Sequence, residues 1–436
     1  MEAGYLVFNN KINNKNKNSS MKKTLSIFLL LTLLVGFQLT TKAQSSPYDL
    51  YGRELNTITT GVPFLQIAPD SRAGAMADIG AATSADVNSQ AYNPSKYVFN
   101  ENTFGVSVSY SPWLRKLVND INLAYLSAYY KITDMDAIAF SLRYFSLGDI
   151  YFSNDQGINP LGDGVAASPN EFSLDFTYSR KLIDELSIAI TPRFIYSDLC
   201  NGYDPYGDNN KPALAGAADL SLFYQQDFRA KGLFNSTLRA GLAFQNIGSK
   251  ISYTSSNKRD FLPMNLKLGI GYEMAFDEYN KLTINGEINK LLVPTNPVFA
   301  TDEDGRIIYD ESNNPIIAAG MDPNVSVAEG IIHSFYDAPG GFREEMQEIN
   351  AALGLEYGYR DLFFVRLGYF YESPYKGNRQ FLTCGVGLKY SVFNLDVSYL
   401  FAINQYHPLA NTLRFTLSFD FASFNKEDIK RQGRLK

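Results

Sequence analysis

The chain has 436 residues, of which 14% are aromatic and only 19% are charged, and its formal net charge is -6. The length suffices for two or three soluble domains, but 29 Tyr and 31 Phe beside a single Trp favour an all-β protein with one apolar face. The acidic balance excludes the basic surface that nucleic-acid binding needs, so no nucleic-acid partner is expected.

The first 43 residues are predicted to be an extension followed by an export signal. Residues 1–20 are rich in Asn and Lys, and Met21 is a candidate start. Residues 21–43 combine Lys22 and Lys23, an apolar run at 25–39 and small residues before Gln44, which is the pattern of a secretory signal peptide rather than of a buried helix. No later run of about 18 apolar residues occurs, so an exported chain that crosses a membrane several times must cross as a β-barrel.

Residues 44–100 contain the only long stretch of the mature chain that reads neither as strand nor as loop. Asp70 and Ser71 supply N-cap oxygens for a short helix over residues 71–77, which is rich in Ala. Such a short helix with small side chains is marginal alone, so it needs walls around it. We therefore expect an N-terminal plug, or hatch, inside the barrel. Its candidate residues from this stretch are Pro69, Asp70, Arg72, Gly74, Asp78 and Asp86.

Residues 103–421 show period-2 alternation that predicts about fourteen strands of roughly ten residues, the length of tilted transmembrane strands. In the clearest strand, Phe172, Leu174 and Phe176 alternate with polar residues. Alternation alone does not tell which face is inside, and a soluble barrel stays possible. The export signal, the Tyr residues at strand ends and the strand length favour an outer-membrane barrel with lipid contact. Long and short connections alternate, which predicts both termini, including the tail at 422–436, in the periplasm.

Charged residues recur at the positions that would face the lumen, including Arg143, Asp175, Arg366 and Asp396. Opposite charges there can pair with each other and with the plug, so a plugged pore is expected rather than an open one. The glycines of Gly269-Ile-Gly271 and Gly385-Val-Gly387 lie in strands without a following helix, so they are expected where the plug approaches the wall, not in phosphate loops.

The longest connection, residues 291–349, is predicted to be extracellular and to contain two short helices, over residues 325–335 and 342–349. An apolar patch on this loop has two interpretations: it packs on the barrel rim as a lid, or it docks a protein partner. The residues of the patch are Ile331, Ile332, Phe335, Tyr336 and Phe342.

No catalytic, metal or cofactor site is predicted. The two His, His333 and His407, have no ligand cluster at metal-binding spacing, and no G-x-S-x-G motif is present. The chain is therefore expected not to be an enzyme. Cys200 and Cys384 fall in a loop and in a strand, so both are expected to be free thiols.

Residues 63–80, 82–86 and 93–97, together with residues 335–342, resemble the PorV family of type IX secretion proteins from Bacteroidota. The chain is more loosely similar to FadL-type transporters, which are fourteen-stranded barrels with an N-terminal hatch. The resemblance adds Asn93 and Pro94 as hatch residues, although this element is shared across the wider superfamily.

The PorV resemblance implies a non-enzymatic role in protein secretion. Its implied partners are a translocon barrel of the SprA or Sov type, the C-terminal signal domains of cargo, a PorU-like sortase and the bilayer with its lipopolysaccharide. The alternative function is a FadL-type channel for hydrophobic small molecules, which requires an apolar pocket between hatch and wall.

Overall fold

The computed structural model describes residues 56–113, 120–152, 165–199, 211–254, 259–304, 306–403 and 412–421. The predicted extension at 1–20, the signal peptide at 21–43 and the tail at 422–436 lie outside the described residues, as do Cys200 and His407. Cys384 is a free thiol. Within these ranges, no helix is both long and apolar enough to cross a bilayer.

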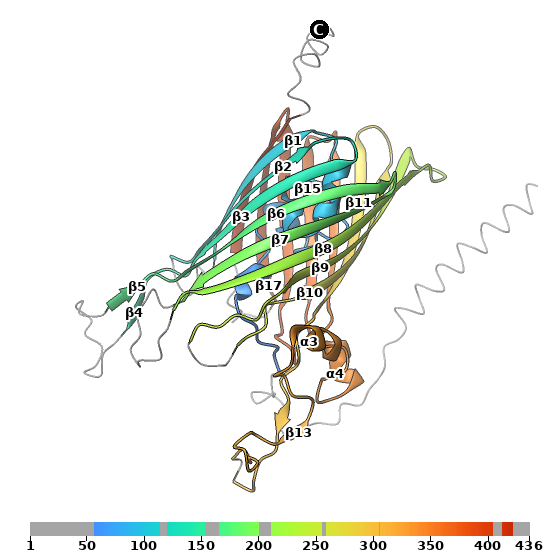
Figure 1. Ribbon diagram of the computed structural model, residues 1–436. Coiled ribbons are helices and arrows are strands. Elements are labelled where there is room, and N and C mark those ends of the chain that lie inside the picture. Colours follow the sequence, from blue (N-terminus) through green and yellow to red (C-terminus); the bar gives the residue numbers. More distant parts are fainter. Residues whose placement is uncertain are drawn as a thin grey trace, which may run out of the picture. The chain divides into compact units, whose positions relative to one another are not determined.

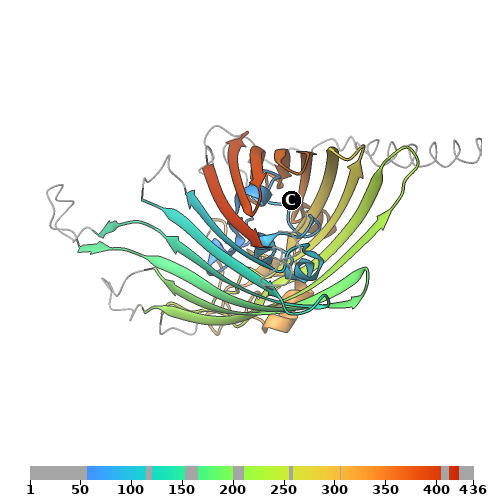
Figure 2. The same ribbon diagram turned by 90° about the horizontal axis from the view of Figure 1, so that it is seen from above.

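Fourteen antiparallel strands close into one barrel (Figures 1 and 2). Each strand pairs with the next barrel strand along the chain, and β1 pairs with β18 to close the ring. The predicted fold class, an all-β barrel of fourteen antiparallel strands, is therefore confirmed. The strands are β1 (Phe104–Pro112), β2 (Asn122–Lys131), β3 (Asp136–Ser146), β6 (Asn170–Ile183), β7 (Leu186–Asp198), β8 (Ala213–Phe228), β9 (Asn235–Gly248), β10 (Asn265–Ala275), β11 (Asn280–Leu291), β14 (Asn350–Tyr359), β15 (Phe363–Tyr371), β16 (Gln380–Tyr390), β17 (Phe393–Ala402) and β18 (Thr412–Phe421).

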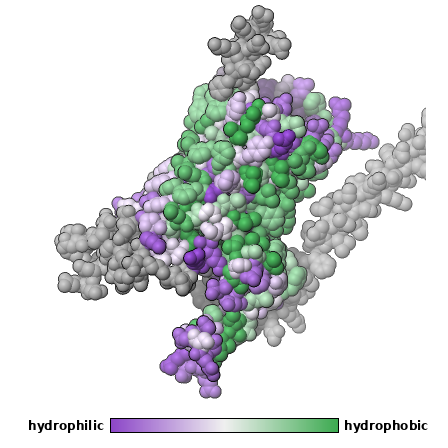
Figure 3. Space-filling model, viewed as in Figure 1, coloured by the Kyte–Doolittle hydropathy of each residue, from purple (hydrophilic) through white to green (hydrophobic). Residues whose placement is uncertain are grey.

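Apolar side chains of the strands point outward and polar side chains point into the barrel. Phe176, Ile190 and Leu382 are each about half exposed, at 53%, 54% and 50%. Their strand neighbours Asp175 and Thr177 are buried. The barrel surface is accordingly hydrophobic over much of its visible face (Figure 3). This inside-out arrangement is that of a membrane barrel, because lipid replaces water outside the wall.

The connections differ in length at the two ends of the barrel. Six short turns lie at what we call the inner end, at residues 132–135, 184–185, 229–234, 276–279, 360–362 and 391–392. In the turn after β14, Arg360 and Asp361 both have positive φ (58° and 51°), the conformation that keeps a tight hairpin aligned with the strand twist. The long connections lie at the outer end. In outer-membrane barrels short turns usually face the periplasm and long loops the exterior.

Residues 56–100, which we call the luminal segment, run inside the barrel (Figure 2). The segment contains three short 3-10 helices and one turn of α-helix rather than the seven-residue helix predicted at 71–77. Asp70 caps the α-helical turn, since its carboxylate accepts a hydrogen bond from the Ala73 amide at 3.0 Å. The elements are η1 (Pro63–Gln66), α2 (Ser71–Gly74), η2 (Val87–Ala91) and η3 (Pro94–Phe99).

The longest outer connection, residues 292–349, carries a small two-stranded sheet and two helices (Figure 1). The sheet consists of β12 (Val298–Phe299) and β13 (Ile317–Ala319), and the helices are α3 (Val327–His333) and α4 (Phe342–Gln347). Ser326 and Glu329 form a capping box that starts α3. A second small sheet, β4 (Ile150–Phe152) with β5 (Val165–Ala167), extends from another outer connection.

Candidate functional site

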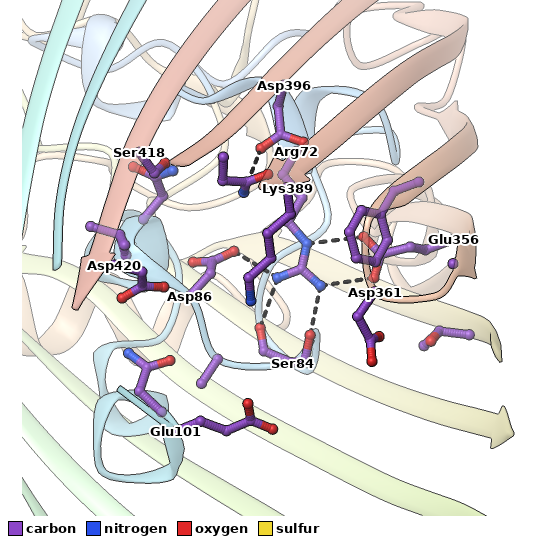
Figure 4. A pocket seen from close by; sticks show the side chains of 18 of the residues that line it. Arg72, Ser84, Asp86, Glu101, Glu356, Asp361, Lys389, Asp396, Ser418 and Asp420 are labelled. Atoms are coloured by element: carbon purple, nitrogen blue, oxygen red, sulfur yellow. Dashed lines mark hydrogen bonds and ion pairs between the residues drawn. The ribbon is translucent and has the colours of Figure 1, made fainter. Parts of the chain in front are cut away.

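Arg72 is the centre of an ionic network between the luminal segment and the barrel wall (Figure 4). Its guanidinium donates two hydrogen bonds to Glu356 of β14, at 3.0 Å from Nε and 2.9 Å from Nη2. Nη1 also donates to Asp86 at 2.8 Å and to the Ser84 carbonyl, and Nη2 donates to the Ser84 hydroxyl. A planar guanidinium that engages a carboxylate in this forked manner binds with defined geometry, so Arg72 fixes the segment against β14.

The network continues along the wall. Arg366 of β15 donates from Nε to Glu356 at 2.6 Å and also binds Asp396 of β17. A second buried cluster, on β6, β7 and β8, joins Arg193 to Asp175 at 2.6 Å and to Asp219 at 3.0 Å. Asp175, Arg366 and Asp396, which the alternation placed in the lumen, therefore form ion pairs, as expected for charges that are taken out of bulk water. Arg143 instead donates to the Leu65 carbonyl of the luminal segment at 2.6 Å.

Most of the predicted hatch residues make specific contacts inside the barrel. Asp78 binds Arg414 of β18 at 3.0 Å, and the side-chain amide of Asn93 donates to Ala81 O and to Leu222 O of β8, both at 2.9 Å. The Tyr92 hydroxyl donates to Asp70 at 2.6 Å. Pro94 begins η3, and Pro69 directly precedes the Asp70 cap. These predicted residues thus bind the luminal segment to itself and to the wall, although their role as a hatch stays a prediction.

Glycines in the wall create the space that the segment occupies. A Cβ at Gly241 would lie 1.9 Å from Ala81 O, and a Cβ at Gly368 would lie 2.3 Å from Ala77 N. The predicted close approach is seen at Gly269, Gly271 and Gly385, whose added Cβ atoms would meet residues 75 or 81–82. Gly387 instead faces Asp396 and Arg366. Any side chain at Gly241 or Gly368 would displace the backbone of the luminal segment, so the segment can pack this closely only against glycine in the wall.

Cavities remain beside the luminal segment at both ends of the barrel. One of about 300 Å³ opens toward the inner end, and its lining is dominated by charged side chains such as Arg72, Glu356 and Asp396 (Figure 4). The other, of about 370 Å³, lies at the outer end beside Ile58 and Pro63. A cavity rich in paired charges is a poor site for a hydrophobic solute, because apolar groups gain little where polar groups must stay hydrated.

Buried ion pairs hold the long outer loop on the barrel rim. Lys290 at the end of β11 binds Glu345 of α4 at 3.0 Å and also Glu348, and all three side chains are buried. Lys376, in the outer connection after β15, binds Glu344 at 2.6 Å and Glu348 at 2.9 Å. The α4 end of the loop is therefore anchored both to a wall strand, β11, and to a neighbouring outer connection.

One residue of the predicted apolar patch packs on the barrel rim, and the other four are exposed. Ile331 turns inward and packs against the rim cluster around Phe261 and Leu292. The remaining four residues of the patch stay exposed, by between 50% and 80% of their surface: Ile332, Phe335, Tyr336 and Phe342. Met346, also exposed, adds to this surface, which we call the outer patch. The loop thus has one anchored side and one apolar side that is largely exposed among the described residues.

Acidification is expected to tighten the docking of this loop. Burial, and then the nearby negative charges of Glu345 and Glu348, raise the pKa of Asp337 from 3.8 to about 6, although Lys290 and a hydrogen bond from the Thr295 amide oppose the shift. Between these pH values the Asp337 carboxyl is therefore protonated in the docked loop and ionised in the undocked loop, which favours docking. The contribution of this proton to the stability of the docked loop is complete below pH 3.8 and is lost as the pH rises through about 6.

Asp337→Asn keeps the acceptor for Thr295 without the charge, so we expect its loop to resist proteolysis at pH 7.5 as the native loop does at pH 5. Limited proteolysis of residues 292–349 at both pH values measures this. Equal cleavage of native and substituted loops at pH 7.5 would contradict it, and Asp302→Asn on the exposed part of the loop is the control.

A family model described as type IX secretion system protein PorV matches residues 51–298. The chain belongs to the PorV family. Similar solved structures include the Pseudomonas putida toluene transporter TodX, at 11% identity and a TM-score of 0.44, covering 80% of this chain and 97% of that one. The Ralstonia pickettii toluene transporter TbuX is 12% identical with a TM-score of 0.40, covering 81% and 98%. A Pseudomonas aeruginosa FadL homologue is 12% identical with a TM-score of 0.39, covering 84% and 99%. A comparison with curated protein sequences finds no match.

Several contacts that shape the interior of this PorV-family barrel could not be assigned from the sequence. Glu287 accepts hydrogen bonds from the Gly80 and Ala81 amides at 2.9 and 2.8 Å, and Lys96 donates to Gly80 O at 2.8 Å. Gly241 and Gly368 occupy luminal positions of the alternation, as do the glycines that the sequence did identify. A luminal position occupied by glycine was therefore the signal that would have found them. Among the described residues, no group of three or more His, Cys, Asp or Glu is placed to hold a metal ion.

Proposed function

We propose that this protein is a non-enzymatic adaptor of type IX secretion in the outer membrane. In this proposal the outer loop binds the C-terminal signal domain of secreted cargo as it leaves a SprA- or Sov-type translocon, and passes it to a PorU-like sortase complex at the cell surface. The tail after Phe421 then faces the periplasm. Membership of the PorV family supports the pathway, since that family consists of outer-membrane secretion proteins.

The observation that carries the proposal is the outer patch on an anchored loop. Phe342 is 80% exposed and Ile332 is 59% exposed, while Glu345 and Glu348 hold the same loop on the rim. Exposed aromatic and aliphatic side chains that cluster on a fixed support are typical of protein interaction sites. The luminal segment supports a docking role over a diffusion pore, because it occupies the space that a solute would need.

Replacing both Phe335 and Phe342 by alanine is expected to weaken cargo binding by at least tenfold, since exposed aromatic anchors carry much of the binding energy at such sites. The measurement is capture of a tagged cargo C-terminal domain by the purified, detergent-solubilised protein. The matched control replaces Phe234 and Phe276, which are 50% and 49% exposed at the inner end. Capture that is unchanged in the outer double variant would refute the assignment of the patch.

A channel for hydrophobic small molecules remains the second candidate, and the outer-end cavity beside Ile58 and Pro63 is the observation that favours it. Its lining also contains Glu348, Lys376 and Arg379, which limits its apolar surface. Lipid or detergent retained inside the purified barrel, together with normal secretion in cells that lack the protein, would support the channel and oppose the adaptor.

A further inference from the structure

The first described residues lie at the outer end of the barrel. The Asn56 amide donates to Tyr375 O at 3.2 Å, and its side-chain amide donates to Glu344 at 2.9 Å. Asn296 of the long outer loop donates to Thr57 O at 3.2 Å. Tyr375, Glu344 and Asn296 all belong to outer connections, so residues 56–57 are held at the end that faces away from the short turns.

From there the luminal segment makes one continuous pass toward the inner end. Close to the outer end, the Gly61 amide donates to Phe261 O at 2.9 Å. Midway, the Ser71 amide donates to Thr416 of β18 at 2.8 Å. At the inner end, Lys131 binds Asn100 O at 2.8 Å, and β1 then begins at Phe104 opposite Phe421. The chain thus enters the lumen at one end and starts the wall at the other.

Residues 56–62, which we call the entry, are closely packed against the barrel wall. Ile58 packs against the rim cluster that contains Phe261, Met264 and Leu292. A Cβ at Gly61 would lie 2.4 Å from Cγ2 of Ile251, so the backbone passes this side chain in close contact. Val62, directly after it, is fully buried and takes a positive φ of 46°. A non-glycine residue held in this conformation indicates that the surrounding contacts dictate the path.

We propose that this chain enters its barrel from the cell surface, so that the residues before Asn56 leave the barrel on the extracellular side. Short turns mark the periplasmic end of outer-membrane barrels, and Asn56 is bound at the opposite end. The mature N-terminus is then displayed outside the cell, while the chain after Phe421 faces the periplasm. This differs from the expectation that both termini are periplasmic, and it does not depend on the proposed adaptor role.

The test labels single cysteines in intact cells with a membrane-impermeant maleimide, in a background that carries Cys200→Ser and Cys384→Ser. Thr59→Cys is the probe, because Thr59 is exposed and belongs to the entry. Glu278→Cys, exposed in an inner turn, marks the periplasmic side, and Ser312→Cys, exposed in the outer loop, marks the surface. Thr59→Cys is expected to react in intact cells as Ser312→Cys does, whereas Glu278→Cys reacts only after the outer membrane is permeabilised.

A second measurement uses an epitope inserted between Glu54 and Leu55, with the same epitope after Lys436 as its partner. Antibody is expected to bind the first in intact cells and the second only in permeabilised cells. Retention of the folded barrel is checked for every variant by its resistance to unfolding in sodium dodecyl sulfate without heating. Labelling of Thr59→Cys and of the N-terminal epitope only after permeabilisation would overturn the proposal.

Discussion

Gly241→Val is expected to displace the luminal segment from its position against the wall and to make the barrel conduct ions. The Cβ that this substitution adds would lie 1.9 Å from Ala81 O and 2.6 Å from Ala81 C, which are backbone atoms that no rotamer change can move away. Overpacking of a filled interior costs about 1–3 kcal/mol, and a clash with backbone belongs at the upper end of that range. Because the segment fills the lumen, its displacement opens a path along the wall.

The matched control is Gly216→Val on the neighbouring strand β8, where an added Cβ meets nothing within 4 Å. Single-channel conductance in planar bilayers measures the opening. Unfolding in urea, followed through the fluorescence of Trp113, measures the stability, since Trp113 is the only Trp and is buried at the outer end. If Gly241→Val stays closed and unfolds at the same urea concentration as Gly216→Val, the fit between wall and segment is not what keeps the lumen shut.

Arg72→Met is expected to destabilise the folded barrel by about 3–5 kcal/mol, the usual cost of removing one partner of a buried ion pair. The substitution leaves Asp86 without its cation, and Glu356 keeps only Arg366. Side chains of Arg72 and Glu356 are only 11% and 9% exposed, so water does not replace the lost hydrogen bonds freely. Arg72→Lys keeps the charge but loses the forked contact, and its effect is expected to be intermediate.

Arg180→Met is the control for this experiment, because Arg180 pairs with Asp136 at 3.3 Å on the surface and is 54% exposed. Exposed pairs contribute about 0–1 kcal/mol. The readout is again the urea midpoint from Trp113 fluorescence. Similar midpoints for Arg72→Met and Arg180→Met would show that the Arg72 network adds no stability beyond a surface pair.

The outer-loop helices show how far local sequence signals reach. Residues 325–335 and 342–349 were predicted as helices and α3 and α4 lie within them, because the Ser326 capping box and the turn at residues 337–341 act locally. The anchoring of α4 could not be predicted from these signals. Lys290 lies at the end of β11 and Lys376 in the connection after β15, and only the closed barrel brings both to Glu348.

The burial of single patch residues likewise could not be predicted from local sequence. Ile331 and Ile332 are adjacent in sequence and equally apolar, yet Ile331 packs on the rim and Ile332 is exposed. Helical geometry points neighbouring side chains about 100° apart, so the direction of each one depends on where the helix is placed on the barrel. Placement is a tertiary property, and the sequence left the lid and the docking surface as alternatives.

The sequence by itself determined the strands, their number and the alternation of long and short connections. Each of these follows from period-2 polarity and turn residues that act over a few positions. It also determined that charges would gather on one face of the wall, as at Asp175 and Arg366. Only the tertiary structure decided which charges pair, which residues of the luminal segment each wall glycine meets, and from which end the segment enters. Those features depend on the register and closure of fourteen strands around one segment, and contacts between residues hundreds of positions apart, such as Ser71 with Thr416, leave no local pattern.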